Sequence, residues 1–491
     1  MPSTRTVALG SILLLAAALR LHGLNDLSPL GNEYFYFYLS LHPSDFHQFL
    51  NGIRNNPLHL LITQLIPYWM ALWRDSPGWL RLPSVFFGCA GVWGVWRLAE
   101  LNAGARRAGV AAFLLAVSLL HIEWSVRTEL YALISALPLF LTVALLRLEK
   151  KPGFPVAYGL GALLLIYSSP YAAPLAVIHA LSAAFLPVER RRRVVLSLTR
   201  AWLAAAACFV PWLVFVLPSM RAWVGHDFTG QNPGLETLGQ FLGRIPLFFA
   251  QGGELTADLW HWGPLLPGLL AVLYFACYLA SLVRVSSAKG DQVLKISHLA
   301  VPSGIAAVTL MDLAAHNYFS HRQLAWVLPF YLIAVADGFL FLFDGLAARA
   351  RLSAKTAAVA FAAIGLALAT ASLGLYFESV GAQIALGDGL RRVVRDVEAN
   401  IRPGDVLVFS DERLAQEFLF HYDRAAFRNT PDYLDFDEPP QAVRDGKENR
   451  VEIADSSSPR TPARNSDGKS WYFEGTTNDL RVSVPRRSRP N

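Results

Sequence analysis

Residues 356–377 read TAAVAFAAIGLALATASLGLYF, an uninterrupted run of apolar and small side chains without a charged residue. A helix of this length measures about 30 Å, which matches the hydrocarbon core of a bilayer. In lipid, a helix satisfies its backbone hydrogen bonds internally, whereas an isolated strand does not. The run therefore predicts a helix that crosses a membrane.

Similar blocks recur along the 491 residues, of which 54% are hydrophobic and only 16% are charged. Soluble domains carry about 25% charged residues. Further spans are expected at residues 7–22, 80–98, 107–122, 129–146, 155–168, 170–187, 200–218, 263–283, 297–314 and 324–344. The fold class predicted is an α-helical polytopic membrane protein of about 11 spans. We interpret 7–22 as an uncleaved span and not as a signal peptide, because many spans follow it.

The apolar block 57–73 is ambiguous, since it is long enough to span but contains Pro57 and Pro67. If it spanned, every later loop would change sides, and the basic loop Arg190–Arg193 would face outward against the positive-inside rule. Prolines and aromatic side chains are tolerated in a helix at the membrane interface. We therefore expect 57–73 to be an in-plane or re-entrant helical segment.

With that assignment and a cytoplasmic N-terminus, each expected cytoplasmic segment after the first span is basic. The outer side then holds two large loops, 23–80 and 219–262, and the C-terminal segment. The net charge of +6 reports this orientation and does not indicate nucleic-acid binding. All three cysteines lie in apolar blocks, so no structural disulfide is expected.

The composition changes after residue 377, which divides the chain into a transmembrane domain at 1–377 and a small non-cytoplasmic α/β domain at 378–491. In the second domain, apolar residues at helical spacing predict an amphipathic helix at 388–402. The expected short elements are a strand at 406–409, a second element at 418–422 and a strand at 471–473, with a flexible polar segment within 436–469. No glycine-rich phosphate loop is present, which argues against an ATP-driven transporter.

Charged groups at a membrane boundary are costly and are therefore functional candidates. Glu33 follows the first span beside a run of aromatic residues, and a carboxylate there could take a proton from an acceptor hydroxyl. The alternative is a helix-start acid with Asn32 as the N-cap. His59 opens the in-plane block, where it could contact a phosphate or simply be solvated.

Three arginines, Arg81, Arg127 and Arg322, lie at outer span boundaries, against the charge bias of the chain. A guanidinium can bind a phosphate through paired, charge-assisted hydrogen bonds. They could instead extend to lipid headgroups, or pair with Glu123, Glu129 or Asp312. The aromatic residues Tyr36, Tyr68, Trp124 and Tyr318 could stack on a sugar or form an interfacial belt.

Together these segments resemble the membrane glycosyltransferases of the GT-C fold, in the family that contains protein O-mannosyltransferases and aminoarabinose transferases. The resemblance covers most of residues 7–425. It is carried, in order, by Asn32-Glu33, Asn56-Pro57-Leu58, Arg81-Leu82-Pro83-Ser84, Arg127 with Tyr131, Tyr318-Phe319 followed by Arg322 and Pro329, and Arg402-Pro403-Gly404-Asp405. Each motif is weak alone, and the order and spacing provide the specificity.

The chain departs from the family at its first acidic pair, where Asn32 stands in place of the aspartate that the family favours as base. An amide cannot accept the proton. Glu33 would then take this role, or Asp26 or Asp45 would, or the chain would be inactive.

The resemblance implies an inverting transfer of a hexosyl or pentosyl group from a polyprenyl-phosphate donor to a glycan, lipid or protein acceptor at the outer face. Arg127 and Arg322, with Arg81 and His59, would hold the phosphate. Asn32, Tyr131 and Tyr318 would contribute to substrate binding. No cofactor is required, although a divalent metal is compatible with the scheme. The absence of an Asn-x-Ser/Thr sequon favours a bacterial inner membrane. The alternatives are a non-catalytic partner subunit and a lipid or solute transporter.

Overall fold

The structure is a computed structural model of the chain. It describes residues 3–27, 29, 33, 65–66, 69–70, 73, 76–129, 131–150, 156–186, 188–224, 235–251, 265–287, 291–315, 321–402, 405–409, 412–423, 443–444, 450–453, 470–474 and 481–483. Two compact units are present. The first comprises Met1–Leu24, Pro57–Leu65 and Arg81–Ser379, and the second comprises Asn25–Asn56, Ile66–Leu80 and Val380–Asn491.

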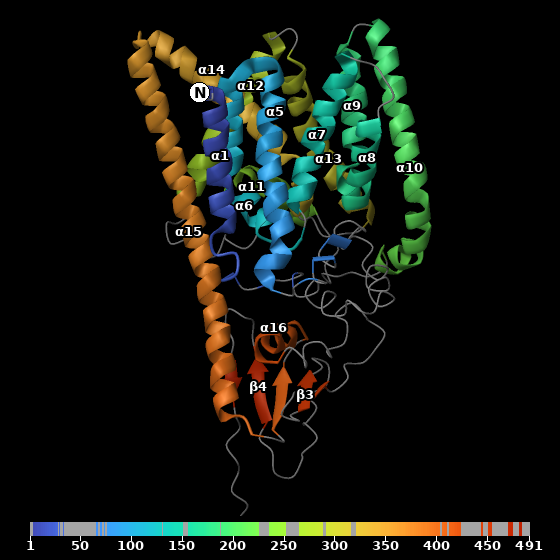
Figure 1. Cartoon of the computed structure of the whole chain (residues 1–491), viewed down its shortest axis with the longest axis vertical. Helices are drawn as coiled ribbons and strands as arrows, with labels where there is room; N and C mark the ends of the chain where they lie inside the picture. The colour runs from blue at the N-terminus through green and yellow to red at the C-terminus, as the bar shows by residue number, and fades with distance from the viewer. Residues whose placement is uncertain are drawn as a thin grey trace, which may run out of the picture. The chain divides into compact units, whose positions relative to one another are not determined.

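The first unit is built from long helices that run side by side (Figure 1). The α-helices that lie wholly or partly in it are α1 (Thr4–Leu21), α5 (Pro77–Val117), α6 (Leu119–Ser125), α7 (Tyr131–Lys150), α8 (Val156–Ser168), α9 (Leu175–Ser182), α10 (Val188–Val224), α11 (Leu235–Gln251), α12 (Leu265–Ser287), α13 (Gln292–Ala315), α14 (Leu328–Arg349) and α15 (Ala354–Asn400). Short 3-10 helices are η1 (Pro170–Ala172), η2 (Ala183–Phe185) and η3 (His321–Leu324).

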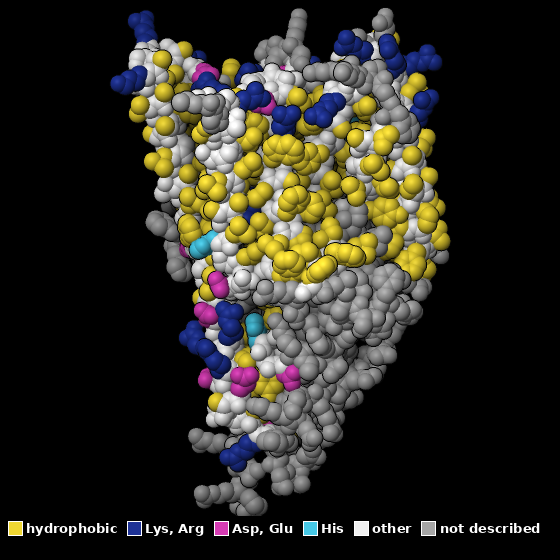
Figure 2. Space-filling model, viewed as in Figure 1, with side chains coloured by type: hydrophobic (Ala, Val, Ile, Leu, Met, Phe, Trp, Pro, Cys, Tyr) yellow, Lys and Arg dark blue, Asp and Glu magenta, His cyan; other side chains and the backbone are white. Residues whose placement is uncertain are grey.

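Eight described helices are long and apolar enough to cross a membrane: α1, α5, α7, α10, α12, α13, α14 and α15. Apolar side chains cover much of the visible surface of this unit, and Lys and Arg gather at one of its ends (Figure 2). The predicted helical, multi-pass membrane fold is confirmed. Eight is fewer than the expected 11 because α5 contains two of the predicted spans, while α8 and α9 are shorter helices.

Helix α5 combines those two spans across a kink at Gly104, whose φ of 79° and ψ of −176° are not helical. Positive φ is accessible to glycine without steric cost. The helix ends at Val117, and Arg20 donates hydrogen bonds to the carbonyls of Leu115 and Ala116 at 3.4 and 3.1 Å. The fully buried Arg20 therefore supports the end of α5, where carbonyls lack helical partners.

Two parts of the helical unit differ from expectation. The predicted outer loop 219–262 contains α11, because Phe241, Ile245 and Phe248 recur at helical spacing and are buried on one face. The predicted span 356–377 and the predicted amphipathic helix 388–402 form one continuous helix, α15, and the two compact units divide this helix after Ser379. The in-plane block 57–73 lies mostly outside the described residues.

A directional hydrogen-bond chain joins α7, α8, α9 and α10. The indole N–H of Trp202 donates to the Tyr158 hydroxyl at 3.0 Å, and this hydroxyl lies 2.7 Å from His179 Nδ1. His179 Nε2 lies 3.0 Å from Thr142 Oγ1, which donates to the Pro138 carbonyl at 2.7 Å. An indole only donates and a carbonyl only accepts, which fixes the direction of the hydrogen bonds between them. The Tyr158 hydroxyl donates to His179 Nδ1, and His179 Nε2 donates to Thr142, so His179 carries its proton on Nε2.

A charged network lies where Lys and Arg gather, which we call the basic end. Arg107 contacts Asp291 at 2.6 Å and Asp337 at 3.3 Å, and Arg284 contacts Asp337 at 2.9 Å. Asp337 and the Arg107 side chain are almost fully buried. The opposite charges compensate one another where water is scarce, so the network ties α5, α12 and α14 to the turn before α13.

The second unit contains a five-stranded sheet, formed by β1 (Val406–Phe409), β2 (Val443–Arg444), β3 (Arg450–Ile453), β4 (Ser470–Glu474) and β5 (Arg481–Ser483) in the order β2-β3-β1-β4-β5. The central strand β1 pairs parallel with β3 and β4, and both edge strands are antiparallel. Its core contains side chains of β1, of α16 (Glu412–Tyr422) and of the second half of α15. Strands lie at the predicted positions 406–409 and 471–473.

Candidate functional site

The turn between α6 and α7 places two charged pairs at the end of the helix bundle opposite the basic end. Arg127 lies two residues after the end of α6 and 3.6 Å from the Glu123 carboxylate, one helical turn earlier. Both side chains are about one-tenth exposed. At this depth, the attraction between the charges is stronger than on an open surface.

The second pair joins this turn to η3. Arg322 lies 3.8 Å from the Glu129 carboxylate. The guanidinium is 29% exposed, whereas the carboxylate is 10% exposed. We call Glu123, Arg127, Glu129 and Arg322 the arginine–glutamate cluster. It contains two sequence-predicted arginines that are far apart in the chain. Both pair with glutamates, which was one of the alternatives that the sequence left open.

Aromatic side chains pack against residues that neighbour this cluster in the sequence, Trp124 and His321. Phe248 of α11 has ring-centroid distances of 5.8 Å to Trp124 and 4.8 Å to His321. His321 also stacks on Phe241 at 4.7 Å, and its Nε2 lies 3.0 Å from the Phe241 carbonyl oxygen. The predicted residue Tyr131 lies 6.1 Å from Trp124. Helix α11 therefore helps to fix the positions of both charged segments.

Asp312 contributes another buried carboxylate near the same end of the bundle. It is fully buried on α13 and accepts a hydrogen bond of 3.1 Å from the Tyr171 hydroxyl. The sequence suggested Asp312 as a partner for an arginine. The structure describes its contact with the neutral Tyr171 hydroxyl of η1, and a pairing with an arginine stays a prediction.

Arg81 lies near the start of α5 and is fully buried. Its guanidinium donates a hydrogen bond of 2.8 Å to the carbonyl oxygen of Leu24, in the turn after α1. This contact anchors the chain that leaves α1. Its role as a phosphate ligand stays a prediction.

Glu33 is helical and 1% exposed. It belongs to the second compact unit, whereas the residues of the arginine–glutamate cluster belong to the first. Three other predicted site residues, Asn32, His59 and Tyr318, lie outside the described residues. The catalytic role of Glu33 stays a prediction.

The cluster presents two guanidinium groups and two carboxylates at the boundary of the bundle. An arginine can release a carboxylate and bind a phosphate with similar fork geometry. Within the described part of the chain, no group of three or more His, Cys, Asp or Glu side chains is arranged to hold a metal ion.

Phe248 and Phe241 are the contributors that the sequence reasoning missed, because 219–262 was treated as a loop. The signal was present, since Phe241, Ile245 and Phe248 follow the spacing of one helix face. The polar chain from Trp202 to Thr142 was also missed. Polar side chains within apolar blocks indicate that hydrogen bonds between helices exist, but their spacing in the sequence does not show which side chains bond to each other.

By sequence, neither a protein-family model nor a curated protein matches the chain. Its structure is similar to that of ArnT from Cupriavidus metallidurans bound to undecaprenyl phosphate, with a TM-score of 0.52 and 13% identity over 94% of this chain and 92% of that chain. It is also similar to the archaeal oligosaccharyltransferase AglB from Archaeoglobus fulgidus in complex with an inhibitory peptide and a dolichol-phosphate. There the TM-score is 0.46 and the identity 13%, over 86% of this chain and 63% of AglB, so the chain spans less than two thirds of AglB.

The similarity to ArnT shows that the chain has the GT-C fold of membrane glycosyltransferases, as its motifs predicted. At 13% identity, the similarity concerns the fold alone.

Proposed function

We propose that this chain is a glycosyltransferase that moves a sugar from a polyprenyl-phosphate donor to an acceptor hydroxyl at the non-cytoplasmic face of a membrane. The fold that it shares with ArnT bound to undecaprenyl phosphate supports a lipid-phosphate substrate. We further propose a bacterial inner membrane as its location. The acceptor would be a glycan, a lipid or a protein.

The observation that carries the proposal is the arginine–glutamate cluster. Arg127 and Arg322 come from separate segments, and both lie at the end of the bundle opposite the basic end. Two guanidinium groups there suit a phosphate that remains at the headgroup level while its lipid lies in the bilayer. Arg81 and His59 are further proposed contacts of the phosphate.

In the proposed reaction, the acceptor hydroxyl oxygen attacks the anomeric carbon from the side opposite the phosphate. The new glycosidic bond forms as the bond from the anomeric carbon to the phosphate oxygen breaks, and polyprenyl phosphate leaves with the electron pair. Glu33 takes the hydroxyl proton, and the arginines stabilise the charge on the leaving phosphate. This single displacement inverts the anomeric configuration. It requires no cofactor, and a divalent metal would be compatible with it.

The test measures transfer of radiolabel from a polyprenyl-phosphate sugar in vesicles that contain the full chain. We expect Glu33→Gln to reduce transfer at least about 100-fold, because the amide cannot accept the proton. Arg322→Gln should also reduce it at least about 100-fold, because one group that stabilises the leaving phosphate is lost. The matched controls are Asp388→Asn, an exposed acid of the second unit, and Arg106→Gln, which pairs with Asp344 at the basic end.

Both control variants should transfer at the wild-type rate. Full activity of Glu33→Gln would remove Glu33 as the base and return Asp26 and Asp45 to consideration. A wild-type chain that transfers label from no such donor would contradict the transferase proposal. If that chain still bound the donor lipid, a non-catalytic partner subunit would be favoured, and Asn32 in place of an acid makes this the main alternative.

A further inference from the structure

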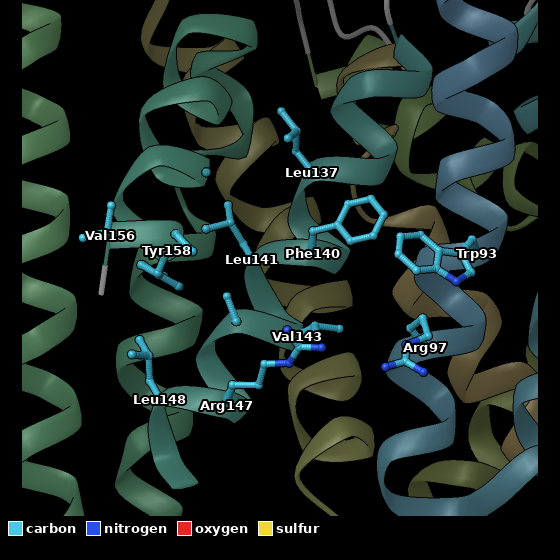
Figure 3. A pocket seen from close by; sticks show the side chains of 13 residues that line it. Trp93, Arg97, Leu137, Phe140, Leu141, Val143, Arg147, Leu148, Val156 and Tyr158 are labelled. Carbon is cyan, nitrogen blue, oxygen red and sulfur yellow. The ribbon is translucent and has the colours of Figure 1, made fainter. Parts of the chain in front are cut away.

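A pocket of about 640 Å³ lies between α5, α7 and α8, away from the arginine–glutamate cluster (Figure 3). This volume falls in the range of small-molecule sites. The lining is mostly apolar, and Trp93 of α5 and Phe140 of α7 pack against each other in its wall with ring centroids 5.5 Å apart. The pocket therefore offers an apolar slot at the lipid-facing side of the helices.

Two arginines line one end of this slot. Figure 3 shows Arg97 of α5 and Arg147 of α7 reaching toward each other, with Leu137 at the far end. Leu137 and Arg147 are ten residues apart on α7, which corresponds to about 15 Å along the helix axis. The charged end lies where Lys and Arg gather, so the apolar part of the slot extends toward the bilayer centre.

The charges at this end are only partly compensated. Arg97 lies 3.7 Å from Glu100, with its side chain 42% exposed, but Glu100 also pairs with Arg5 and accepts a hydrogen bond from Trp96. Arg147 is exposed and has no ion pair or hydrogen bond among the residues that the structure describes. Among the residues that the structure describes, the arginine-lined end of the pocket thus has excess positive charge next to an apolar slot.

The back wall of the slot is rigid. Tyr158 of α8 is almost fully buried, and its hydroxyl is held between Trp202 and His179. Ala157 beside it is exposed and also lines the slot. The two cations suit the phosphodiester of a lipid headgroup, and the fixed apolar wall beside them suits one acyl chain.

We propose that this pocket binds an anionic phospholipid from the leaflet at the basic end of the bundle. Arg97 and Arg147 hold the headgroup phosphate, and one acyl chain lies along Trp93, Phe140 and Leu137. Basic pockets between membrane helices bind acidic headgroups in this way. The proposal depends on the membrane spans and does not depend on the transferase reaction.

The test is native mass spectrometry of the purified full chain in detergent, titrated with dioleoyl phosphatidylglycerol or dioleoyl phosphatidylcholine. We expect wild type to retain phosphatidylglycerol preferentially. The double variant Arg97→Gln/Arg147→Gln should bind it about 25-fold more weakly, since each interfacial arginine contributes about a fivefold factor. Ala157→Trp keeps both arginines but fills the apolar slot, so this variant should also fail to retain phosphatidylglycerol.

Arg106→Gln is the matched control, because Arg106 lies at the same end, outside this pocket, and pairs with Asp344. It should bind phosphatidylglycerol like wild type. Glycerol phosphate, which has no acyl chains, should not displace the bound lipid. Equal binding of both phospholipids, unchanged affinity in the double variant, or displacement by glycerol phosphate would each overturn the proposal. Elution profiles on size exclusion verify that each variant is folded.

Discussion

Gly338 on α14 lies where two helices meet backbone to backbone. A Cβ built on it would fall 1.7 Å from the carbonyl oxygen of Cys277 on α12. Small residues at such contacts let membrane helices approach closely. The α12–α14 contact therefore requires glycine at this position.

We expect Gly338→Ala to destabilise the protein by about 1–3 kcal/mol or more, because the added methyl group must push the helices apart. The measurement is the melting temperature of the purified chain in detergent. Gly345→Ala on the same helix is the control, since nothing lies within 4 Å of its added Cβ. This control should leave the melting temperature unchanged or slightly raised. Equal melting temperatures for the two variants would refute the proposed close contact.

Tyr158→Phe tests the hydrogen-bond chain. The substitution keeps the ring but leaves the Trp202 N–H and His179 Nδ1 without their described partner, and we expect it to cost about 1–3 kcal/mol. Tyr167→Phe is the control, because its exposed hydroxyl donates only to the Cys208 carbonyl. A melting temperature for Tyr158→Phe no lower than that of Tyr167→Phe would show that these hydrogen bonds between Trp202, Tyr158 and His179 contribute nothing to the stability of the protein.

At this scale, the sequence predicted which residue types matter but not which of them meet. Arg127 with Glu123 was one of several alternatives, and their spacing of i,i+4 is consistent with the contact that the structure describes. Arg322 with Glu129 was one of several alternatives, because nothing local joins positions so far apart. Polar pairs across helices depend on how the helices rotate and cross, and hydropathy does not carry that information.

Elements were predicted better than their ends. Long apolar runs located the spans, because the requirement to cover a bilayer leaves few alternatives. The kink in α5 at Gly104 lies between the predicted spans 80–98 and 107–122, which a polar stretch separates in the sequence. The span 356–377 and the helix 388–402 were both predicted, but not that α15 joins them, because helical backbone geometry continues where hydropathy falls. Helix α11 was missed, because it is too short and amphipathic to resemble a span.

The ion pair between α5 and the start of α13 predicts a pH dependence. Burial raises the pKa of Asp291, but the hydrogen bond and charge of Arg107 outweigh it, so the pKa lies below its usual 3.8. A carboxyl whose pKa is lower in the folded state than in the unfolded state stabilises the fold when the pH is above its unfolded-state pKa. This stabilisation is lost as the pH falls through the folded-state pKa. The pairing should therefore be complete at pH 7.

We expect Asp291→Asn to lower the melting temperature at pH 7, and the difference from wild type to shrink as the pH falls below 3.8. Thermal unfolding in detergent between pH 7 and pH 3 measures this difference. Asp344→Asn, which removes a half-exposed pair with Arg106, should have little effect at any pH. A difference for Asp291→Asn that stays constant across this range would contradict the lowered pKa.

On the scale of the whole molecule, orientation in the membrane is the main prediction. Ser353 precedes α15 among Arg349, Arg351 and Lys355, and Asp388 lies 35 residues further along the same helix. That separation is about 52 Å, more than the roughly 30 Å of hydrocarbon. The positive-inside rule predicts that Ser353 lies on the cytoplasmic side and Asp388 on the other.

Single cysteines at these two positions, in a chain whose three native cysteines are replaced, should react differently with a membrane-impermeant maleimide. Asp388→Cys should be labelled in intact cells, and Ser353→Cys only after permeabilisation. Labelling of both from the same side would show that α15 does not cross the membrane between them. The reverse pattern would invert the proposed topology and with it the location of the transfer reaction.

The backbone contact at Gly338 has a consequence for how the chain can change in length. Asp337 and Gly338 are adjacent on α14, and each must face its own partner, Arg107 and Cys277. Inserting or deleting one residue earlier in α14 would rotate both by about 100° around the helix axis, so the ion pair and the close approach would fail together. Related chains should therefore vary in sequence along this helix while keeping its register fixed.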